Sequence, residues 1–267
     1  MWKWESTEQA KAVIVMVHSA YEHHRRYAWQ IEQWRSKGFH VIMSDLPGHG
    51  TESLKESAHR ESFTDYEKTV AVTIKVGLKD ELPVFVIAHG MGATIAMNVL
   101  SKSKVDVAGA IFTSPWLNLV KTPSKISNAL TSIHKLTANM KIDHDIKTRH
   151  LTRSQEVIDT EGNDEMFNSM VTVKWYHDLQ SYMKQTMLIK EKFPVIPVSV
   201  HTGEKDGISD TSAAKNWLNQ QHLKQYCFKE WADCQHDLMQ EPEKEDIFAE
   251  MQSFVQNRMR SLGYVVD

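Results

Sequence analysis

The stretch Val84-Phe-Val-Ile-Ala-His-Gly90-Met-Gly-Ala-Thr-Ile-Ala-Met-Asn-Val-Leu100 decides the fold. Its first residues, through Ile87, form an apolar, mostly β-branched run that is typical of a buried strand. From Met91 onward, Ile95 and Val99 follow at helical spacing. The residues at positions 88, 90 and 92, between the two patterns, are small. Bulky side chains there would collide with the neighbouring strand and with the helix, so we expect a sharp turn from strand to helix.

This turn has the frame of the nucleophile elbow, G-x-S-x-G, with two departures. Ala88 replaces the first glycine, and Gly90 stands where the pattern requires serine. In acyl hydrolases that serine attacks the carbonyl carbon of the substrate. The frame therefore predicts a serine hydrolase, whereas position 90 carries no hydroxyl that could react.

Length and composition exclude several classes of protein. The 267 residues suit one large α/β domain, and the net charge of −3 gives no reason to expect nucleic-acid binding. No apolar run reaches the roughly 18 residues of a membrane span. The first residues lack the apolar core of a signal peptide, so we expect a cytoplasmic protein. The histidines and cysteines show neither H-E-x-x-H nor zinc spacing, so neither a metal nor a cofactor is expected. The oligomeric state stays open.

Apolar runs and helical patterns alternate in both ends of the chain. Strands are predicted at 12–17, 39–43, 84–87, 107–112, 195–200 and 225–231, and helices at 26–37, 63–78, 212–221 and 245–262. This order predicts an α/β fold with a doubly wound, mostly parallel sheet. From 117 to 192 only helical patterns remain, at 126–140 and 166–188. We therefore expect a core of residues 1–116 and 193–267 with a helical cap inserted at 117–192.

The predicted cap carries an excess of positive charge. From Lys121 to Arg153 there are seven basic residues against Asp143 and Asp145, a net of +5. A solvated helical face is the ordinary explanation. The alternative is attraction to anionic lipid headgroups, which makes transient contact with a membrane surface through the cap a hypothesis.

An acyl hydrolase also needs an acid and a base, which in open parallel sheets lie at the carboxyl ends of strands. Asp206, on a glycine-bearing loop after the strand at 195–200, is the predicted acid, with Glu204 and Asp210 as alternatives. His236, after the last strand, is the predicted base. The order 90, 206, 236 is the order of nucleophile, acid and base in this type of fold.

The oxyanion that forms during acyl transfer requires backbone donors. The N–H groups of Ala20, in the loop after the first strand, and of Met91, directly after the elbow, are the predicted donors. Ser19 and Ser114 could lie near the site. Because neither stands on the elbow, a relocated nucleophile is the weaker hypothesis.

Four motifs, in order, resemble those of the monoacylglycerol lipase/lysophospholipase group of the α/β-hydrolase superfamily. That group carries H-G-x-x-E-H-x-x-R-Y, D-x-x-G-H-G-x-S, G-H-S-M-G-G and H-E-L-x-x-E. The matching segments are His18-Ser-Ala-Tyr-Glu-His-His-Arg-Arg-Tyr27, Asp45-Leu-Pro-Gly-His-Gly-Thr-Glu-Ser53, Ala88-His-Gly-Met-Gly-Ala93 and His236-Asp-Leu-Met-Gln-Glu241. Serine stands where the first motif has glycine, and glycine stands where the third has serine.

The resemblance implies a carboxylic-ester hydrolase that acts on a small lipid-like ester, a monoacylglycerol or a lysophospholipid, beneath a mobile cap. It implies a Ser-Asp-His mechanism with an acyl-enzyme on residue 90, Asp206 as acid and His236 as base. Loss of the triad serine costs about 10⁶ in kcat in the subtilisin series. With Gly90 we expect the chain to be inactive or nearly so. Either a parental serine was replaced, or the chain is a naturally serine-less pseudoenzyme that binds a lipid-like ligand without turnover.

Overall fold

The computed structural model describes residues 1–103, 105–123, 138–189 and 193–264. Its centre is a seven-stranded sheet in the order β1-β3-β2-β4-β5-β8-β9. These strands are β1 (Trp2–Trp4), β2 (Ala12–Val17), β3 (Phe39–Met43), β4 (Val84–His89), β5 (Gly109–Thr113), β8 (Val198–Gly203) and β9 (Tyr226–Trp231). Only the edge strand β1, which the sequence patterns did not predict, runs antiparallel to its neighbour within this sheet. The predicted α/β fold with a mostly parallel sheet is confirmed.

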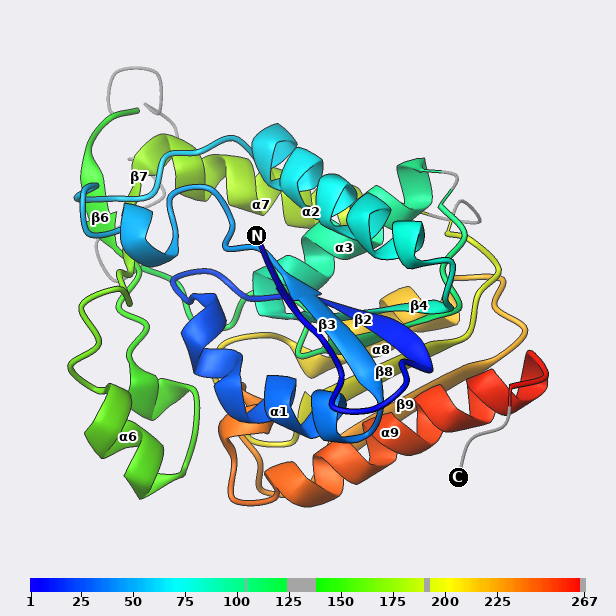
Figure 1. The fold of residues 1–267 in the computed structure, drawn as a ribbon. Helices are drawn as coiled ribbons and strands as arrows, with labels where there is room; N and C mark the ends of the chain where they lie inside the picture. Colours follow the sequence, from blue (N-terminus) through cyan, green and yellow to red (C-terminus); the bar gives the residue numbers. More distant parts are fainter. Residues whose placement is uncertain (104, 124–137, 190–192, 265–267) are drawn as a thin grey trace.

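Helices cover both faces of the sheet (Figure 1). They are α1 (Ala28–Ser36), α2 (Phe63–Gly77), α3 (Gly90–Lys102), α7 (Val173–Met187), α8 (Thr211–Asn219) and α9 (Lys244–Ser261). A further helix, α6 (Gln155–Glu161), lies to one side of the sheet and buries none of its residues (Figure 1). Short 3₁₀ turns lie at His24–Tyr27, Gly50–Glu52, Leu78–Asp80, Thr148–His150 and Leu238–Gln240. Helices α1 and α9 share one hydrophobic core with the sheet, and α2, α3, α7 and α8 share the other. Among the described residues, no helix is both long and apolar enough to cross a bilayer.

Strand β2 shows why the central strands are apolar throughout. All six of its residues are buried. The odd-numbered residues belong to the core beneath α2 and α3, and the even-numbered residues belong to the core beneath α1 and α9. Side chains alternate between the two faces of a strand, so a strand covered on both faces needs apolar residues at every position.

The segment between β5 and β8 differs from the expected purely helical one. Strands β6 (Lys141–Asp143) and β7 (Met170–Thr172) form a separate antiparallel pair, so the helix predicted from residue 166 is wrong in its first turns. Helix α7 begins only after Thr172, whose hydroxyl oxygen accepts the Trp175 N–H at 3.2 Å as an N-cap. The helix predicted at 126–140 lies largely outside the described residues. The division into core and cap at 117–192 remains a prediction.

The carboxyl ends of the parallel strands meet at one edge of the sheet. The loops after β2, β4, β5, β8 and β9 all begin there. In order, they carry Ser19, Gly90, Trp116, Asp206 and His236. This edge therefore brings together residues that are far apart in the sequence.

Candidate active site

The turn between β4 and α3 has the geometry that its small residues predict. The strand ends at His89 and the helix begins at Gly90, which has a φ of +52°. This left-handed conformation is uncommon for residues with a side chain. A Cβ on Gly92 would lie 2.2 Å from the carbonyl oxygen of His18, so a larger residue does not fit there. The elbow thus holds position 90 at the carboxyl edge of the sheet.

Asp206 and His236 are joined across this edge. His236 Nδ1 lies 2.9 Å from Asp206 Oδ2, and both side chains are buried. The Asp206 carboxylate also accepts the backbone N–H groups of Ile208 and Ser209, at 2.8 and 3.0 Å, and the Ser209 hydroxyl at 2.6 Å. These bonds fix the orientation of the carboxylate and hence of the imidazole. The arrangement is that of an acid which orients a base.

The two alternative acids are engaged elsewhere. The Glu204 carboxylate accepts the backbone N–H of Asp233 at 3.0 Å. The Asp210 carboxylate accepts the N–H of Ser212 at 2.9 Å and caps the N-terminus of α8. Of the three predicted candidates, Asp206 is the one that bonds to His236.

The electrostatics of this pair are strongly coupled. Burial lowers the pKa of His236, but Asp206, with smaller contributions from the carboxylates of Asp237 and Glu22, outweighs burial, and the pKa stands above its ordinary 6.5. Burial raises the pKa of Asp206, yet His236 and the hydrogen bonds from Ser209 hold that pKa below 3.8. The carboxylate is therefore ionised near neutral pH and able to stabilise an imidazolium.

Trp116, which the sequence analysis did not single out, lies against the base. Its Nε1 donates to His236 Nε2 at 3.0 Å, and the tryptophan is only 1% exposed. Ser114, which precedes it on the same loop, donates from its hydroxyl to the backbone carbonyl of His236 at 2.7 Å. Nε2 is the atom that takes the proton of the nucleophile in a triad. A signal was present in the sequence, because Thr113-Ser-Pro-Trp116 follows a parallel strand at the carboxyl edge.

Ser19 lies in the space that a side chain at position 90 would fill. A Cβ built on Gly90 would be 2.0 Å from Ser19 Oγ and 3.3 Å from Trp116 Nε1. Ser19 Oγ accepts the N–H of Met91, a predicted oxyanion donor, at 3.1 Å. The other predicted donor residue, Ala20, is buried next to Ser19 in the chain. The structure thus brings both predicted donor residues to the elbow, and their role in catalysis stays a prediction.

A buried ionic cluster supports these loops from below. The guanidinium of Arg26 lies 3.3 Å from Asp237 and 3.7 Å from Glu22. His89, Glu22 and Asp237 also offer ligand-type atoms within 4.8 Å of one another. Arg26 also pairs with Glu161, so one guanidinium is shared by three carboxylates, and we interpret the cluster as a structural ion-pair network. It ties the elbow to the loops that follow β2 and β9.

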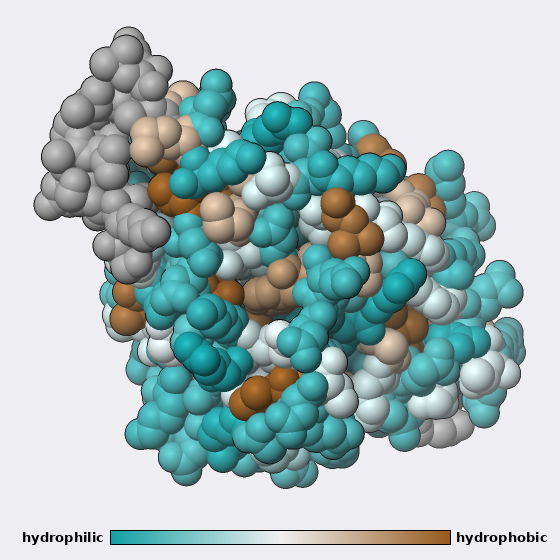
Figure 2. Space-filling view, turned by 90° about the vertical axis from the view of Figure 1, so that its left-hand side faces the viewer, coloured by the Kyte–Doolittle hydropathy of each residue, from teal (hydrophilic) through white to brown (hydrophobic). Residues whose placement is uncertain are grey.

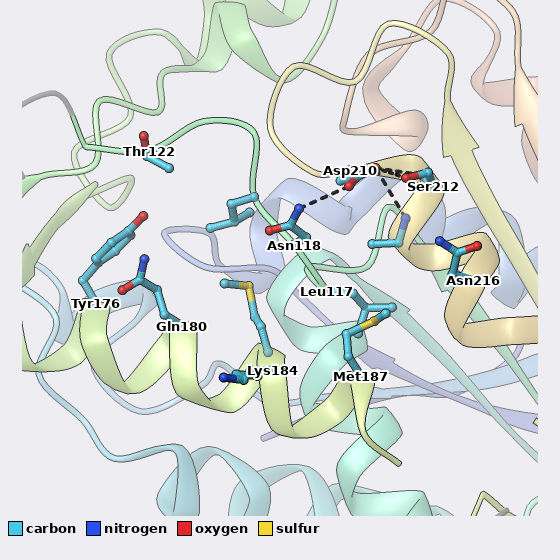
Figure 3. A pocket seen from close by; sticks show the side chains of 13 residues that line it. Leu117, Asn118, Thr122, Tyr176, Gln180, Lys184, Met187, Asp210, Ser212 and Asn216 are labelled. Carbon is cyan, nitrogen blue, oxygen red and sulfur yellow. Dashed lines mark hydrogen bonds between the residues drawn. The ribbon is translucent and has the colours of Figure 1, made fainter. Parts of the chain in front are cut away.

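The structure contains a cavity of about 480 Å³, and Figure 3 shows the side chains that line it. It lies between α7, the start of α8 and the loop after β5. Leu117, Met183 and Met187 give it an apolar part, while Asn118 and Asp210, hydrogen-bonded at 3.2 Å, give it a polar one. One of its lining residues, Leu117, directly follows Trp116 in the chain. This mixed lining suits an amphipathic molecule.

Comparison with known proteins relates this geometry to established families. Residues 8–243 match the family model described as serine aminopeptidase S33. The chain is 33% identical over 256 residues to phospholipase YtpA of Bacillus subtilis (strain 168), with 95% of this chain and 98% of the relative covered. It is 23% identical over 270 residues to the monoglyceride lipase of Mus musculus, with 97% and 87% covered.

Solved structures show the same fold. The monoacylglycerol lipase of Paleococcus ferrophilus has a TM-score of 0.81 at 18% identity, with 96% of this chain and 98% of that chain covered. A soluble variant of the monoglyceride lipase of Saccharomyces cerevisiae, in complex with a substrate analogue, has a TM-score of 0.83 at 18% identity, with 96% and 90% covered. From the match of most of its length, the chain belongs to the serine aminopeptidase S33 family of α/β-hydrolases, a family that points to ester hydrolysis through its lipase and phospholipase relatives.

Proposed function

We propose that this chain carries the site of a carboxylic-ester hydrolase for monoacylglycerols or lysophospholipids, and that Gly90 leaves it inactive or nearly so. The observation that carries the proposal is the Asp206–His236 bond of 2.9 Å beside an elbow without a side chain. The cavity of mixed polar and apolar lining between α7 and α8, and the phospholipase and monoglyceride lipase names of the relatives, support a lipid ester as ligand.

With serine at position 90 the reaction would follow the acyl-enzyme route. The hydroxyl oxygen attacks the ester carbonyl carbon, and its proton passes to His236 Nε2. The N–H groups of Ala20 and Met91 stabilise the oxyanion, and the imidazolium then gives its proton to the departing alcohol oxygen. Water attacks the acyl-enzyme in the second half, so that ester and water become acid and alcohol. Gly90 supplies no oxygen for the first new bond.

Turnover of p-nitrophenyl esters and of a monoacylglycerol tests this proposal. We expect no turnover above buffer from the chain with Gly90. Gly90→Ser, prepared both with Ser19 and with Ser19→Gly, should give a rise of several decades in at least one of the two backgrounds. His236→Ala should abolish that rise. If both serine-restored proteins are folded but inert, the hydrolase proposal is wrong.

The second candidate is a naturally serine-less protein that binds a lipid-like ligand without turnover. The positions of Ser19 and Trp116 favour it, because both occupy places in the site that catalysis needs free. Binding of a non-hydrolysable lipid by the unmodified chain is the measurement that addresses this candidate.

Transient contact of the cap with a membrane surface is a further proposal, which rests on the net positive charge of residues 121–153. Of the basic residues in this region, Lys121 and Lys147 lie 3.4 and 3.5 Å from Asp145, and Arg153 lies 2.8 Å from Glu241. The face in Figure 2 is mostly hydrophilic, with small separate hydrophobic patches. Co-sedimentation with anionic vesicles that disappears at high salt would support the contact.

A further inference from the structure

At two positions of this site, Ser19 and Gly90, serine and glycine are exchanged relative to the group that the chain resembles. The group that the chain resembles has glycine at the position of Ser19 and serine at the position of Gly90, and here the two are exchanged. In space the two positions coincide, because a Cβ on residue 90 would lie 2.0 Å from Ser19 Oγ and 2.7 Å from Ser19 Cβ. Unbonded atoms in proteins do not approach a Cβ so closely. A side chain at position 90 therefore requires Ser19 to move or to change.

The Ser19 hydroxyl also uses a group that catalysis needs. It accepts the Met91 N–H at 3.1 Å, where the oxyanion of a tetrahedral intermediate is expected to bind. Ser19 is 2% exposed, and its own N–H donates to the Glu22 carboxylate at 3.1 Å. The Glu22 carboxylate in turn accepts the hydroxyl of Tyr27 at 2.8 Å. These bonds hold the Ser19 backbone in the position that directs its hydroxyl at the elbow.

Trp116 likewise engages the group of the predicted base, His236, that would accept a proton. Its indole N–H donates to His236 Nε2 at 3.0 Å, so the lone pair that would receive a proton is already engaged. The indole nitrogen also lies 3.3 Å from the place of a Cβ on residue 90. Ser19 thus occupies the space of a side chain at position 90 and bonds to the Met91 N–H, the predicted oxyanion donor. Trp116 bonds to the nitrogen of His236 that would accept a proton.

We infer that Ser19 and Trp116 hold the catalytic centre closed, so that serine at position 90 restores turnover only when Ser19 is removed as well. This inference rests on the proposed hydrolase function. It assigns Ser19 and Trp116 as positioning residues, which act through the Met91 N–H and through His236.

The experiment compares three folded proteins on one p-nitrophenyl ester: Gly90→Ser, Ser19→Gly/Gly90→Ser, and the latter with Trp116→Phe. Since removing one oxyanion donor costs about 10²–10³ in rate, we expect kcat of the double variant to exceed that of Gly90→Ser by roughly 10²-fold or more. Trp116→Phe should add roughly fivefold, the equivalent of one hydrogen bond of about 1 kcal/mol. Ser19→Gly alone is the matched control and should be inert, because it has no nucleophile.

Each other outcome has a definite meaning. If Gly90→Ser alone equals the double variant, the inference is overturned and the hydrolase proposal stands. If all variants are folded and inert, both fail. If a fluorophosphonate modifies the unmodified chain on Ser19, then Ser19 is itself a nucleophile and the inference is overturned.

A second measurement applies if Gly90→Ser does not fold. In the chain with Gly90, Ser19→Ala removes the hydroxyl that accepts the Met91 N–H. Hydrogen exchange of the Met91 amide, followed by NMR, should therefore accelerate. Unchanged protection of Met91 would show that Ser19 does not occupy this donor.

Discussion

At the scale of single residues, His236 receives opposite influences on its two ring nitrogens. Asp206 at Nδ1 stabilises the imidazolium, whereas the Trp116 N–H at Nε2 requires an unprotonated nitrogen. We expect Trp116→Phe to raise the pKa of His236, because protonation then breaks no hydrogen bond. Asp206→Asn should lower this pKa, because burial is then opposed only by the weaker contributions of the Asp237 and Glu22 carboxylates.

Titration of the His236 ring resonances by NMR measures both shifts. The matched control is Trp217→Phe, a buried indole in α8 that packs against Phe112 and Phe193 rather than against His236. It should leave the titration of His236 unchanged. A Trp116→Phe protein with an unaltered pKa would contradict the role of the indole at Nε2.

Sequence reasoning found the residues whose position follows from strand ends. Asp206 and His236 each come after a parallel strand, and such ends converge at one edge. The sequence indicates Ser19 only as a serine near the site, and it gives no role to Trp116. Their contacts depend on which side chain enters the space left by a missing Cβ, and a linear sequence contains no information on vacant volume.

At the scale of elements, α7 is joined to α2 by one buried hydrogen bond. Trp175 Nε1 donates to the hydroxyl of Tyr66 at 2.9 Å, and both residues are at most 1% exposed. Tyr66→Phe leaves the indole N–H buried without this acceptor, which should lower the free energy of unfolding by about 1–3 kcal/mol. Urea denaturation measures the change. Tyr226→Phe, at a residue that is 54% exposed, is the control and should change stability by less than about 0.5 kcal/mol.

The helices and strands were predictable where apolar residues follow a single periodicity, either helical or strand-like. Most strands that are buried on both faces and the helices with a single apolar face lie within about two residues of their predicted bounds, whereas β8 (Val198–Gly203) begins three residues after the strand predicted at 195–200. The start of α7 was not predictable from the sequence. The preceding residues form β7, which is extended because it pairs with β6, and Ile142 of β6 lies opposite Val171 of β7. Helical spacing of apolar residues cannot reveal such a distant partner. Edge strand β1 was missed for the same reason, since it is defined by its pairing with β3.

At the scale of the whole molecule, the cavity between α7 and α8 does not include Ser19, Gly90 or Trp116 among its lining residues, so on the proposed function we expect it to bind a lipid even if the catalytic centre is closed. A monoacylglycerol ether, which has no ester to cleave, should bind the unmodified chain there. At about 100 times its Kd such a ligand adds about 2.7 kcal/mol to stability, equivalent to a rise in Tm of roughly 5–10 °C for a protein of this size.

The same thermal scan with two methionine variants locates the binding. Met187→Glu places a charge in the apolar part of the cavity and should remove most of the shift in Tm. Met140→Glu, at a methionine that is 49% exposed, should retain it. Glycerol alone should produce no shift, because it has no acyl chain to bury. If the ether stabilises Met187→Glu as much as the unmodified chain, the lipid binds elsewhere, and the cavity loses its place in both proposed functions.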